Sequence, residues 1–319
     1  MAKPPPESTK TPQRQRLGEH TRTPCQAVAE IPDISDPVAL MTAAPTDEAL
    51  VVHEGSPRPD TAVRTAVAPK RGPRVPLLPV IDDPVLPVLE ELSHRYEDAG
   101  HRLALTGGAT RDFLLGRRPR DFDLISDANQ DDTETLLTDW AGNSTRSFDR
   151  FGVVSATHGA FKLQVLTFHT PRDWYPAFDP ALLHEDPLHN QLLCADLTIN
   201  TGALLFPGAR WIDPYGAATD VATRILRPPI DPFVTIPGNP RTMVRYARFA
   251  AELGFNVAPD VLAAMTEHAA KIGDDLDWQV IMSLTKIVTA PHPEAGMAIL
   301  RDTTVLDYLP AEWRPRLEF

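Results

Sequence analysis

The residues with the clearest chemical potential lie in one segment, TGGATRDFLLGRRPRDFDLISD, at positions 106–127. Near its end, Asp121 and Asp123 are spaced i and i+2, so in a strand both carboxylates project from the same face. Two carboxylates this close repel each other unless a cation lies between them. Magnesium, a hard ion that takes oxygen ligands, suits such a pair. The spacing therefore predicts a magnesium site.

The glycine pair of the same segment, Gly107 and Gly108, precedes a helix predicted over 110–115 and closed by Gly116. Glycines let a backbone approach a phosphate closely, and the start of a helix directs N–H groups toward it. Arg111 can add a charge-assisted hydrogen bond to the phosphate. Either half alone also fits a tight turn or a solvated acidic strand end. Together, the phosphate cradle and the metal site predict nucleotidyl transfer.

Several further elements must position this segment. The stretch PVLPVLEELSHRYEDAG, at 84–100, places its apolar residues on one face and predicts a helix. Two β-rich runs, 151–156 and 161–168, are joined by a turn at Gly159 and predict a hairpin. The other predicted elements before residue 187 are strands over 103–105 and 121–125 and a helix over 131–140. From about Pro187 the pattern becomes helical, with helices predicted over 242–253, 259–272, 278–288 and 293–300.

These elements predict an α+β fold in three parts. A mixed α/β head covers 76–230, and a helical neck and body covers 231–319. Residues 1–75 hold 12 of the 33 prolines and show weak hydrophobic periodicity. Such a segment cannot bury enough apolar surface to offset the entropy lost on ordering, so it predicts a disordered tail.

The composition argues against several classes of protein, such as disulfide-rich, secreted and membrane-spanning proteins. The formal net charge is -12, which argues against a large nucleic-acid footprint but not against a local basic groove. The two cysteines, Cys25 and Cys194, predict neither a disulfide nor a cysteine-rich metal site and fit a reducing cytoplasm. The N-terminus, MAKPPPESTK, lacks the apolar core of a secretory signal. No apolar run reaches the roughly 18 residues of a membrane span, so no membrane association is expected.

The segment GGATRDFLLGRRPRDFDLIS resembles the head motif of the class II CCA-adding tRNA nucleotidyltransferase and bacterial poly(A) polymerase family, within the DNA polymerase β-like nucleotidyltransferase superfamily. FGVV at 151–154 and LQVLTFH at 163–169 are similar to the family's hairpin. Three later segments also resemble family motifs. They are ADLTINTGAL at 195–204, WIDPYGAATDVATRILR at 211–227 and NPRTMVRYARFAAELGF at 239–255. The resemblance therefore spans about 100–256, with the motifs in family order.

The resemblance implies a polymerase β-like head, of mixed sheet and helices, followed by a helical neck in a divergent and shortened member. It implies that Asp121 and Asp123 are the catalytic residues and hold Mg²⁺. Arg245 and Arg248 lie three apart and hence on one helical face. The implied contacts to a nucleoside triphosphate come from two glycines, one acid and three arginines: Gly107, Gly108, Arg111, Asp196, Arg245 and Arg248.

The departures from the family form gather at two places. The family's glutamate on the second hairpin strand is Gln164 here, and a neutral amide binds metal less well and cannot act as a base. The family's base-reading motif, EDxxR, aligns with Gly238, Asn239 and Thr242, so the donors and acceptors differ. The metal and triphosphate half of the family site is therefore retained in sequence, and the base-reading half is rewritten.

The residues and the resemblance leave three functions open. The first is an active nucleotidyltransferase that moves a nucleoside monophosphate to an RNA or tRNA 3′ end, or to a small molecule, and releases pyrophosphate. The second is a catalytically silent protein that binds a nucleotide or a partner on the same fold. Gln164 favours it, whereas the retained pair of aspartates opposes it. The third is a tRNA repair enzyme with altered base selection, which predicts a basic groove on the helical part.

Overall fold

The computed structural model describes residues 82–147, 152–274 and 276–313. The predicted disordered tail, 1–75, lies outside these residues, as does Phe151 at the start of the predicted hairpin. The first described helix is α1 (Val85–Asp98). The Asp83 carboxylate accepts a hydrogen bond from the Val85 N–H at 2.9 Å. This bond satisfies one of the N–H groups that a helix start leaves without a partner, and α1 begins where the apolar pattern predicts.

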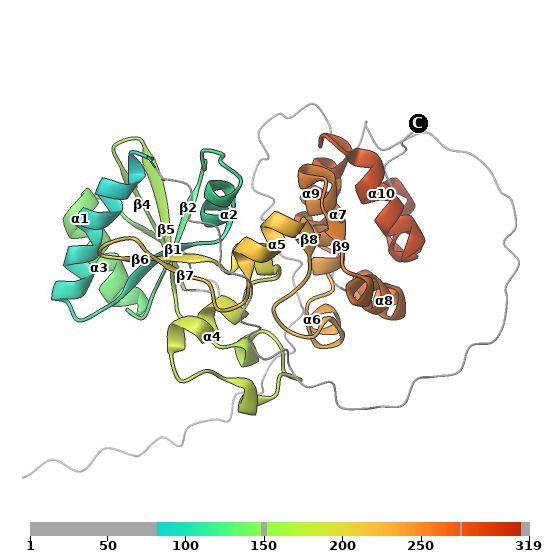
Figure 1. Cartoon of the computed structure of the whole chain (residues 1–319), viewed down its shortest axis with the longest axis horizontal. Helices are drawn as coiled ribbons and strands as arrows, with labels where there is room; N and C mark the ends of the chain where they lie inside the picture. The colour runs from blue at the N-terminus through green and yellow to red at the C-terminus, as the bar shows by residue number, and fades with distance from the viewer. Residues whose placement is uncertain (1–81, 148–151, 275, 314–319) are drawn as a thin grey trace, which may run out of the picture. The chain divides into compact units, whose positions relative to one another are not determined.

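A seven-stranded mixed sheet forms the centre of the first part (Figure 1). Its order is β3-β4-β5-β2-β1-β6-β7. The strands are β1 (Leu103–Thr106), β2 (Phe122–Ser126), β3 (Thr145–Arg146), β4 (Val153–His158), β5 (Phe161–Thr167), β6 (Ala203–Phe206) and β7 (Arg210–Ile212). β2 and β5 run parallel, and the other neighbouring pairs are antiparallel. The strand predicted at 121–125 is confirmed within one residue. The predicted hairpin around Gly159 is also confirmed, although its first described strand, Val153–His158, is shifted by two residues from the predicted 151–156.

Helices cover both faces of this sheet. α1 and α3 (Gln130–Ala141) pack together with the short α2 (Gly108–Leu114) onto one face, and Figure 1 shows α1 and α3 side by side. The core under them includes Leu89, Leu124 and Leu137, which have no accessible surface. α4 (Pro187–Leu193) covers the other face through Leu188 and Leu192. β1 and β2 are therefore buried on both faces, as expected of central strands.

The sheet reaches further along the chain than the sequence pattern predicts. The prediction that the chain becomes helical from about Pro187 holds for α4 but is wrong for residues 203–212, which form β6 and β7. β6 pairs with β1, with Leu205 opposite Ala104. A four-residue apolar run such as ALLF has no period that separates a buried strand from a helix. Only the pairing with β1 decides the matter.

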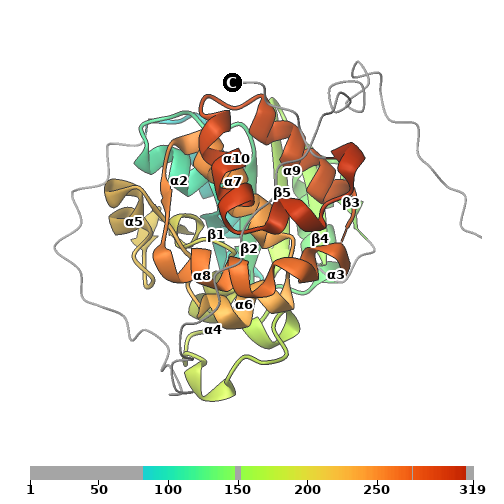
Figure 2. The ribbon, with the colours of Figure 1, turned by 90° about the vertical axis from the view of Figure 1, so that its right-hand side faces the viewer.

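The second part is helical, and Figure 2 looks onto it. Its helices are α5 (Ala217–Thr223), α6 (Pro232–Gly238), α7 (Thr242–Leu253), α8 (Pro259–His268), α9 (Trp278–Val288) and α10 (Pro293–Asp302). α7 and α9 have the bounds that the sequence predicts. The helix predicted over 259–272 ends instead at His268 and continues as the 3-10 segment η5 (Ala269–Asp274). Two short strands, β8 (Ile225–Leu226) and β9 (Asn256–Val257), pair in parallel. They join the segment after α5 to the segment after α7.

α7 lies at the centre of the helical core and packs against both α9 and α10. The approach of α10 is close, because a Cβ on Gly296 would lie 2.7 Å from the Ala247 carbonyl oxygen. Arg245 and Arg248 of α7 are three residues apart and partly exposed, so they share one face of the helix. No helix among the described residues is long and apolar enough to span a membrane. The limits of the head and the neck at 75/76 and 230/231 stay predictions.

Candidate active site

Asp123 lies where β2 meets the glycine turn that follows β1. The two strands pair so that Thr106 stands opposite Asp123, which brings the carboxylate against the next residue, Gly107. A Cβ on Gly107 would lie 3.5 Å from Asp123 Oδ2. Gly107 has φ 72° and ψ −136°, a conformation that only glycine adopts without strain. The turn and the carboxylate pair, predicted as the two halves of one site, are therefore neighbours.

Asp121 directly precedes β2 and carries the second carboxylate of the pair. Both aspartates retain accessible surface. Partial loss of water around the Asp123 carboxylate nevertheless raises its pKa, and the negative charge of Asp121 raises that pKa further. Among the described residues, no cationic side chain forms an ion pair with either carboxylate. A divalent cation would relieve the repulsion between them.

The residues present fit a magnesium ion that is bound together with a triphosphate. Mg²⁺ is usually held by one or two carboxylates, while substrate phosphates and waters complete its shell. Asp121 and Asp123 supply that number. Within the part of the chain that the structure describes, no three His, Cys, Asp or Glu side chains gather to hold a metal by themselves. The register of β2 and β5 places Gln164 beside Asp123, so an amide stands where a third carboxylate would complete such a set.

Hydrogen bonds to the segment that follows α4 hold the glycine turn in place. The hydroxyls of Thr106 and Thr110 both donate to the Gly202 carbonyl, at 3.0 and 2.9 Å. Thr110 also donates to the Gly107 carbonyl at 3.0 Å. These bonds fix the shape of the turn without a ligand. Because the turn is already ordered, the binding of a ligand costs less conformational entropy.

Arg111 is held in place from three sides. Its Nε and one terminal nitrogen donate to Asp112 Oδ1 at 3.1 and 2.8 Å. The other terminal nitrogen donates to Asn200 Oδ1 at 3.0 Å. The guanidinium also lies over the Phe249 ring, with Cζ 5.3 Å from the ring centre. Phe249 belongs to α7, so Arg111 marks the place where the glycine turn meets the neck helix.

Two further predicted nucleotide-binding residues, Asp196 and Arg245, are brought together. Arg245 Nε and Asp196 Oδ2 form an ion pair at 2.5 Å, although they are not aligned as a hydrogen bond. The Asp196 carbonyl accepts a hydrogen bond from the Tyr246 hydroxyl at 3.1 Å. Both contacts join the segment before the 3-10 turn η4 (Thr198–Asn200) to α7. Asp196 therefore positions Arg245, and its contact with a nucleotide stays a prediction.

Arg248 completes a cluster of three arginines. Its guanidinium lies 4.4 Å from the centre of the Phe249 ring, on α7, and its Nε lies 3.8 Å from Glu252. Burial lowers the pKa of Arg248, Glu252 opposes this effect, and the charges of Arg245 and Arg111 lower the pKa further. The three predicted phosphate-binding arginines therefore share one electrostatic field. Each arginine also has an acidic neighbour, which is Asp112, Asp196 or Glu252, so a phosphate would bind here in competition with these carboxylates.

The three positions aligned with the base-reading motif do not form a common edge. A Cβ on Gly238 would lie 2.9 Å from the Tyr175 ring, so there is no room for a side chain. Thr242 is buried, and its hydroxyl donates to the Asn239 carbonyl at 2.7 Å. Only the Asn239 side chain remains for a ligand, and its Oδ1 is buried without a hydrogen-bond partner. Of these three positions, therefore, only Asn239 has a side chain that a ligand could contact.

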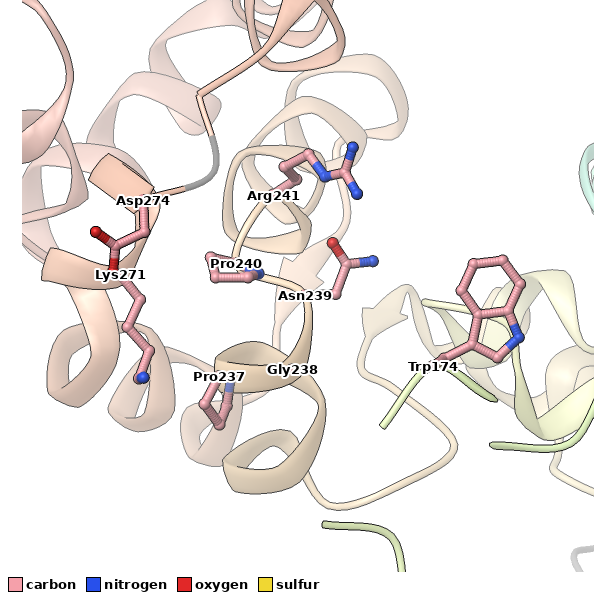
Figure 3. A pocket seen from close by; sticks show the side chains of 8 residues that line it. All are labelled: Trp174, Pro237, Gly238, Asn239, Pro240, Arg241, Lys271 and Asp274. Atoms are coloured by element: carbon pink, nitrogen blue, oxygen red, sulfur yellow. The ribbon is translucent and has the colours of Figure 1, made fainter. Parts of the chain in front are cut away.

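Asn239 lines a pocket of about 290 Å³ at the turn between α6 and α7. Figure 3 shows Trp174, which follows the 3-10 turn η2 (Pro171–Asp173), across this pocket from Asn239 and Arg241. Arg241 donates to Asp277 Oδ2 at 2.7 Å. Its guanidinium is therefore held at the start of α9 and does not replace the motif arginine that the sequence lacks.

Sequence reasoning missed three residues that shape the site. Asn200 and Phe249 lie inside segments that carry the resemblance, but neither side chain is charged, and each acts by holding Arg111. No motif or spacing in the sequence indicated a role for Tyr175. Its contact with Gly238 joins segments that are distant along the chain.

Residues 103–227 match the family of poly A polymerase head domains. The chain is 29% identical over 213 residues to the CC-adding tRNA nucleotidyltransferase of Halalkalibacterium halodurans, covering 67% of this chain and 51% of that protein. It is 32% identical over 215 residues to the multifunctional CCA protein of Methylococcus capsulatus, covering 64% of this chain and 48% of that protein. The chain spans about half the length of the curated relatives it matches.

Two solved structures with the same architecture are those of CCA-adding enzymes. The enzyme of Bacillus stearothermophilus in complex with CTP is 25% identical, with a TM-score of 0.63, over 72% of this chain and 54% of that chain. The enzyme of Thermotoga maritima complexed with tRNA shares the fold at 18% identity, with a TM-score of 0.59, over 72% of this chain and 53% of that chain. The predicted α+β head followed by a helical part is therefore confirmed.

Proposed function

We propose that this chain, whose residues 103–227 match the poly A polymerase head domain, is a magnesium-dependent nucleotidyltransferase of the family of CCA-adding enzymes and bacterial poly(A) polymerases. It transfers a nucleoside monophosphate from a nucleoside triphosphate to the 3′ hydroxyl of an RNA, such as a tRNA, and releases pyrophosphate. One observation carries this proposal. The glycine turn, beside which the Asp123 carboxylate lies, starts the helix that brings Arg111 against the arginine-bearing neck helix.

In this proposal the arginine cluster binds the triphosphate. Arg111, Arg245 and Arg248 come from two separate helices and share one field. Their acidic neighbours, among them Asp112 and Asp196, hold the guanidinium groups in place before the nucleotide arrives. Charge-assisted bonds to phosphate oxygens are stronger than bonds between neutral groups. The nucleotide is therefore bound chiefly by its phosphates, which agrees with the changed base-reading positions.

Asp121 and Asp123 would hold the magnesium beside the glycine turn. Bound magnesium would lower the pKa of the acceptor hydroxyl and neutralise charge on the leaving oxygens. The acceptor oxygen forms a bond to the α-phosphorus while the bond to the β-phosphate oxygen breaks. The proton of the hydroxyl passes to water, and pyrophosphate leaves. The arginines hold the phosphates in position throughout, so the chain contributes mainly orientation and charge.

The test is pyrophosphate release with magnesium and each of the four nucleoside triphosphates. Each is supplied alone, with a tRNA that lacks its 3′ CCA, and with a small-metabolite extract. We expect release only with the RNA, and we expect Asp121→Ala with Asp123→Ala to abolish it. The matched control is Asp139→Ala, an exposed aspartate of α3, which should keep full activity. Release that requires the extract and not the RNA would replace the acceptor in this proposal by a small molecule.

A second candidate function is a catalytically silent protein that binds a nucleotide on the same fold. The position of Gln164 beside Asp123 favours it, because an amide weakens a metal site. This candidate predicts no pyrophosphate release in any combination. It also predicts that a fluorescent nucleotide binds without magnesium and binds equally well to the double aspartate variant. The active enzyme predicts the opposite result in both experiments.

A further inference from the structure

A second pocket, of about 320 Å³, lies between α7 and α9. One wall is the arginine stripe of α7, formed by Arg241, Arg245 and Arg248 at spacing i, i+4 and i+7. The volume is at the lower end of the range for ligand pockets, roughly 300–1,000 Å³. The pocket is strongly basic although the whole chain carries a net charge of -12.

The α9 wall combines an exposed aromatic ring with a free cation. Trp278 is 69% exposed and Met282, one turn later, is 42% exposed, whereas side chains of this kind are ordinarily buried. Lys286 follows one turn further, is exposed, and makes no ion pair with any described residue. Asp277, which precedes Trp278, caps α9 and also accepts the hydrogen bond from Arg241, so the backbone at the start of α9 is fixed beside the arginines.

We propose that this pocket, the α7–α9 groove, binds the single-stranded 3′ end of an RNA acceptor, with one base stacked on Trp278 and backbone phosphates at Lys286 and Arg241. Aromatic rings interleaved with cations are how proteins bind single strands, because every base offers a π-face and every linkage a negative charge. The bases of a duplex are already stacked on each other and cannot lie on Trp278. The inference deepens the proposed function by naming the site that holds its acceptor.

The position of the groove fits an acceptor site. Arg245 and Arg248 line the groove and also share the field of Arg111 at the glycine turn. The groove is therefore continuous in charge with the candidate triphosphate site. A strand stacked on Trp278 would pass Arg245 and Arg248, which line the same groove. A small acceptor would need neither the ring nor Lys286.

The test is equilibrium binding of a short fluorescent single-stranded RNA, measured by anisotropy without nucleoside triphosphate. Trp278→Ala should weaken binding about ten-fold, the order expected for one stacked base. Trp278→Phe should restore most of the affinity, because a phenyl ring also stacks. The control is Tyr308→Ala, an aromatic residue 48% exposed elsewhere, which should bind as the wild type does. Lys286→Gln should reduce the slope of log Kd against log salt by about 0.7.

This test separates the groove from the reaction because it needs no turnover. If the Asp121→Ala with Asp123→Ala variant binds RNA normally and Trp278→Ala does not, the groove is supported even where no pyrophosphate release is found. The proposal is overturned if wild-type protein does not bind the RNA. It is equally overturned if Trp278→Ala binds within two-fold of wild type, or if duplex RNA competes as well as the single strand. Thermal unfolding of each variant checks that the fold is retained.

Discussion

Gln164 on β5 lies directly beside Asp123 on β2, so an amide and a carboxylate share one face of the sheet next to the glycine turn. Parallel strands place such neighbours on the same face. The site therefore has two carboxylates and an adjacent position from which a third is missing. This arrangement supports the view that the metal is held only together with the triphosphate, whose oxygens take the remaining positions.

Gln164→Glu is expected to lower the magnesium concentration for half-maximal pyrophosphate release by roughly ten-fold, the order seen when groups around a metal are changed. The physical reason is an added anionic oxygen beside Asp123. The measurement is a magnesium titration at saturating nucleoside triphosphate and RNA. Gln164→Ala removes the amide without adding charge and should leave the titration midpoint nearly unchanged. Equal midpoints for the Glu and Ala variants would contradict this account.

Asp123→Asn is expected to unfold at a higher temperature than the wild type at neutral pH in the absence of metal, although it loses activity. Its raised pKa means that ionised Asp123 destabilises the folded state above that pKa. The gain should stay below about 1 kcal/mol, because partly exposed charges are screened. It should fade as the pH falls through the folded pKa toward the ordinary value of 3.8. Thermal unfolding with a chelator across this range measures it, and a gain that grows toward acid would show that the sign is wrong.

Arg248→Met is expected to weaken nucleoside triphosphate binding at least about ten-fold, which is the order of one lost charge-assisted hydrogen bond. The same change should not lower thermal stability, because burial and two neighbouring arginines already oppose the charge of Arg248. Titration with a fluorescent nucleotide measures the affinity. Arg301→Met, at an exposed position of α10, is the matched control and should bind as the wild type does. Similar affinities for both variants would remove Arg248 from the phosphate site.

Gly107→Ala is expected to cost about 1–3 kcal/mol of stability and to reduce activity strongly, because Gly107 occupies a glycine-only conformation and relief of the strain would move the turn that lies against Asp123. Gly100→Ala is the control. Gly100 also has a positive φ, of 82°, but a Cβ there meets nothing within 4 Å. The control should therefore lose stability and keep its kcat. Denaturant unfolding and pyrophosphate release distinguish the two, and an equal loss of kcat in both would indicate a general effect of strain.

At the positions that correspond to the base-reading motif, packing contacts explain residues that the resemblance alone does not explain. The resemblance implies that Gly238 stands at the place of a family glutamate, but it does not say why a glycine stands there. The Tyr175 ring occupies the space that a side chain would need. Thr242, at the place of the family arginine, is turned inward to bond the Asn239 carbonyl. Both facts depend on contacts between segments whose distance in space no sequence pattern encodes.

The sequence by itself predicted the candidate metal site and determined the longer helices. The spacing of Asp121 and Asp123, and the apolar period of α7 and α9, depend on residues a few positions apart, so local geometry suffices to interpret them. Only the tertiary structure decided that 203–212 extends the sheet and that Gln164 lies beside Asp123. It alone brought α9 against the arginines of α7. Strand pairing and helix packing join residues far apart in the chain, and their free energy comes from contacts that no local window contains.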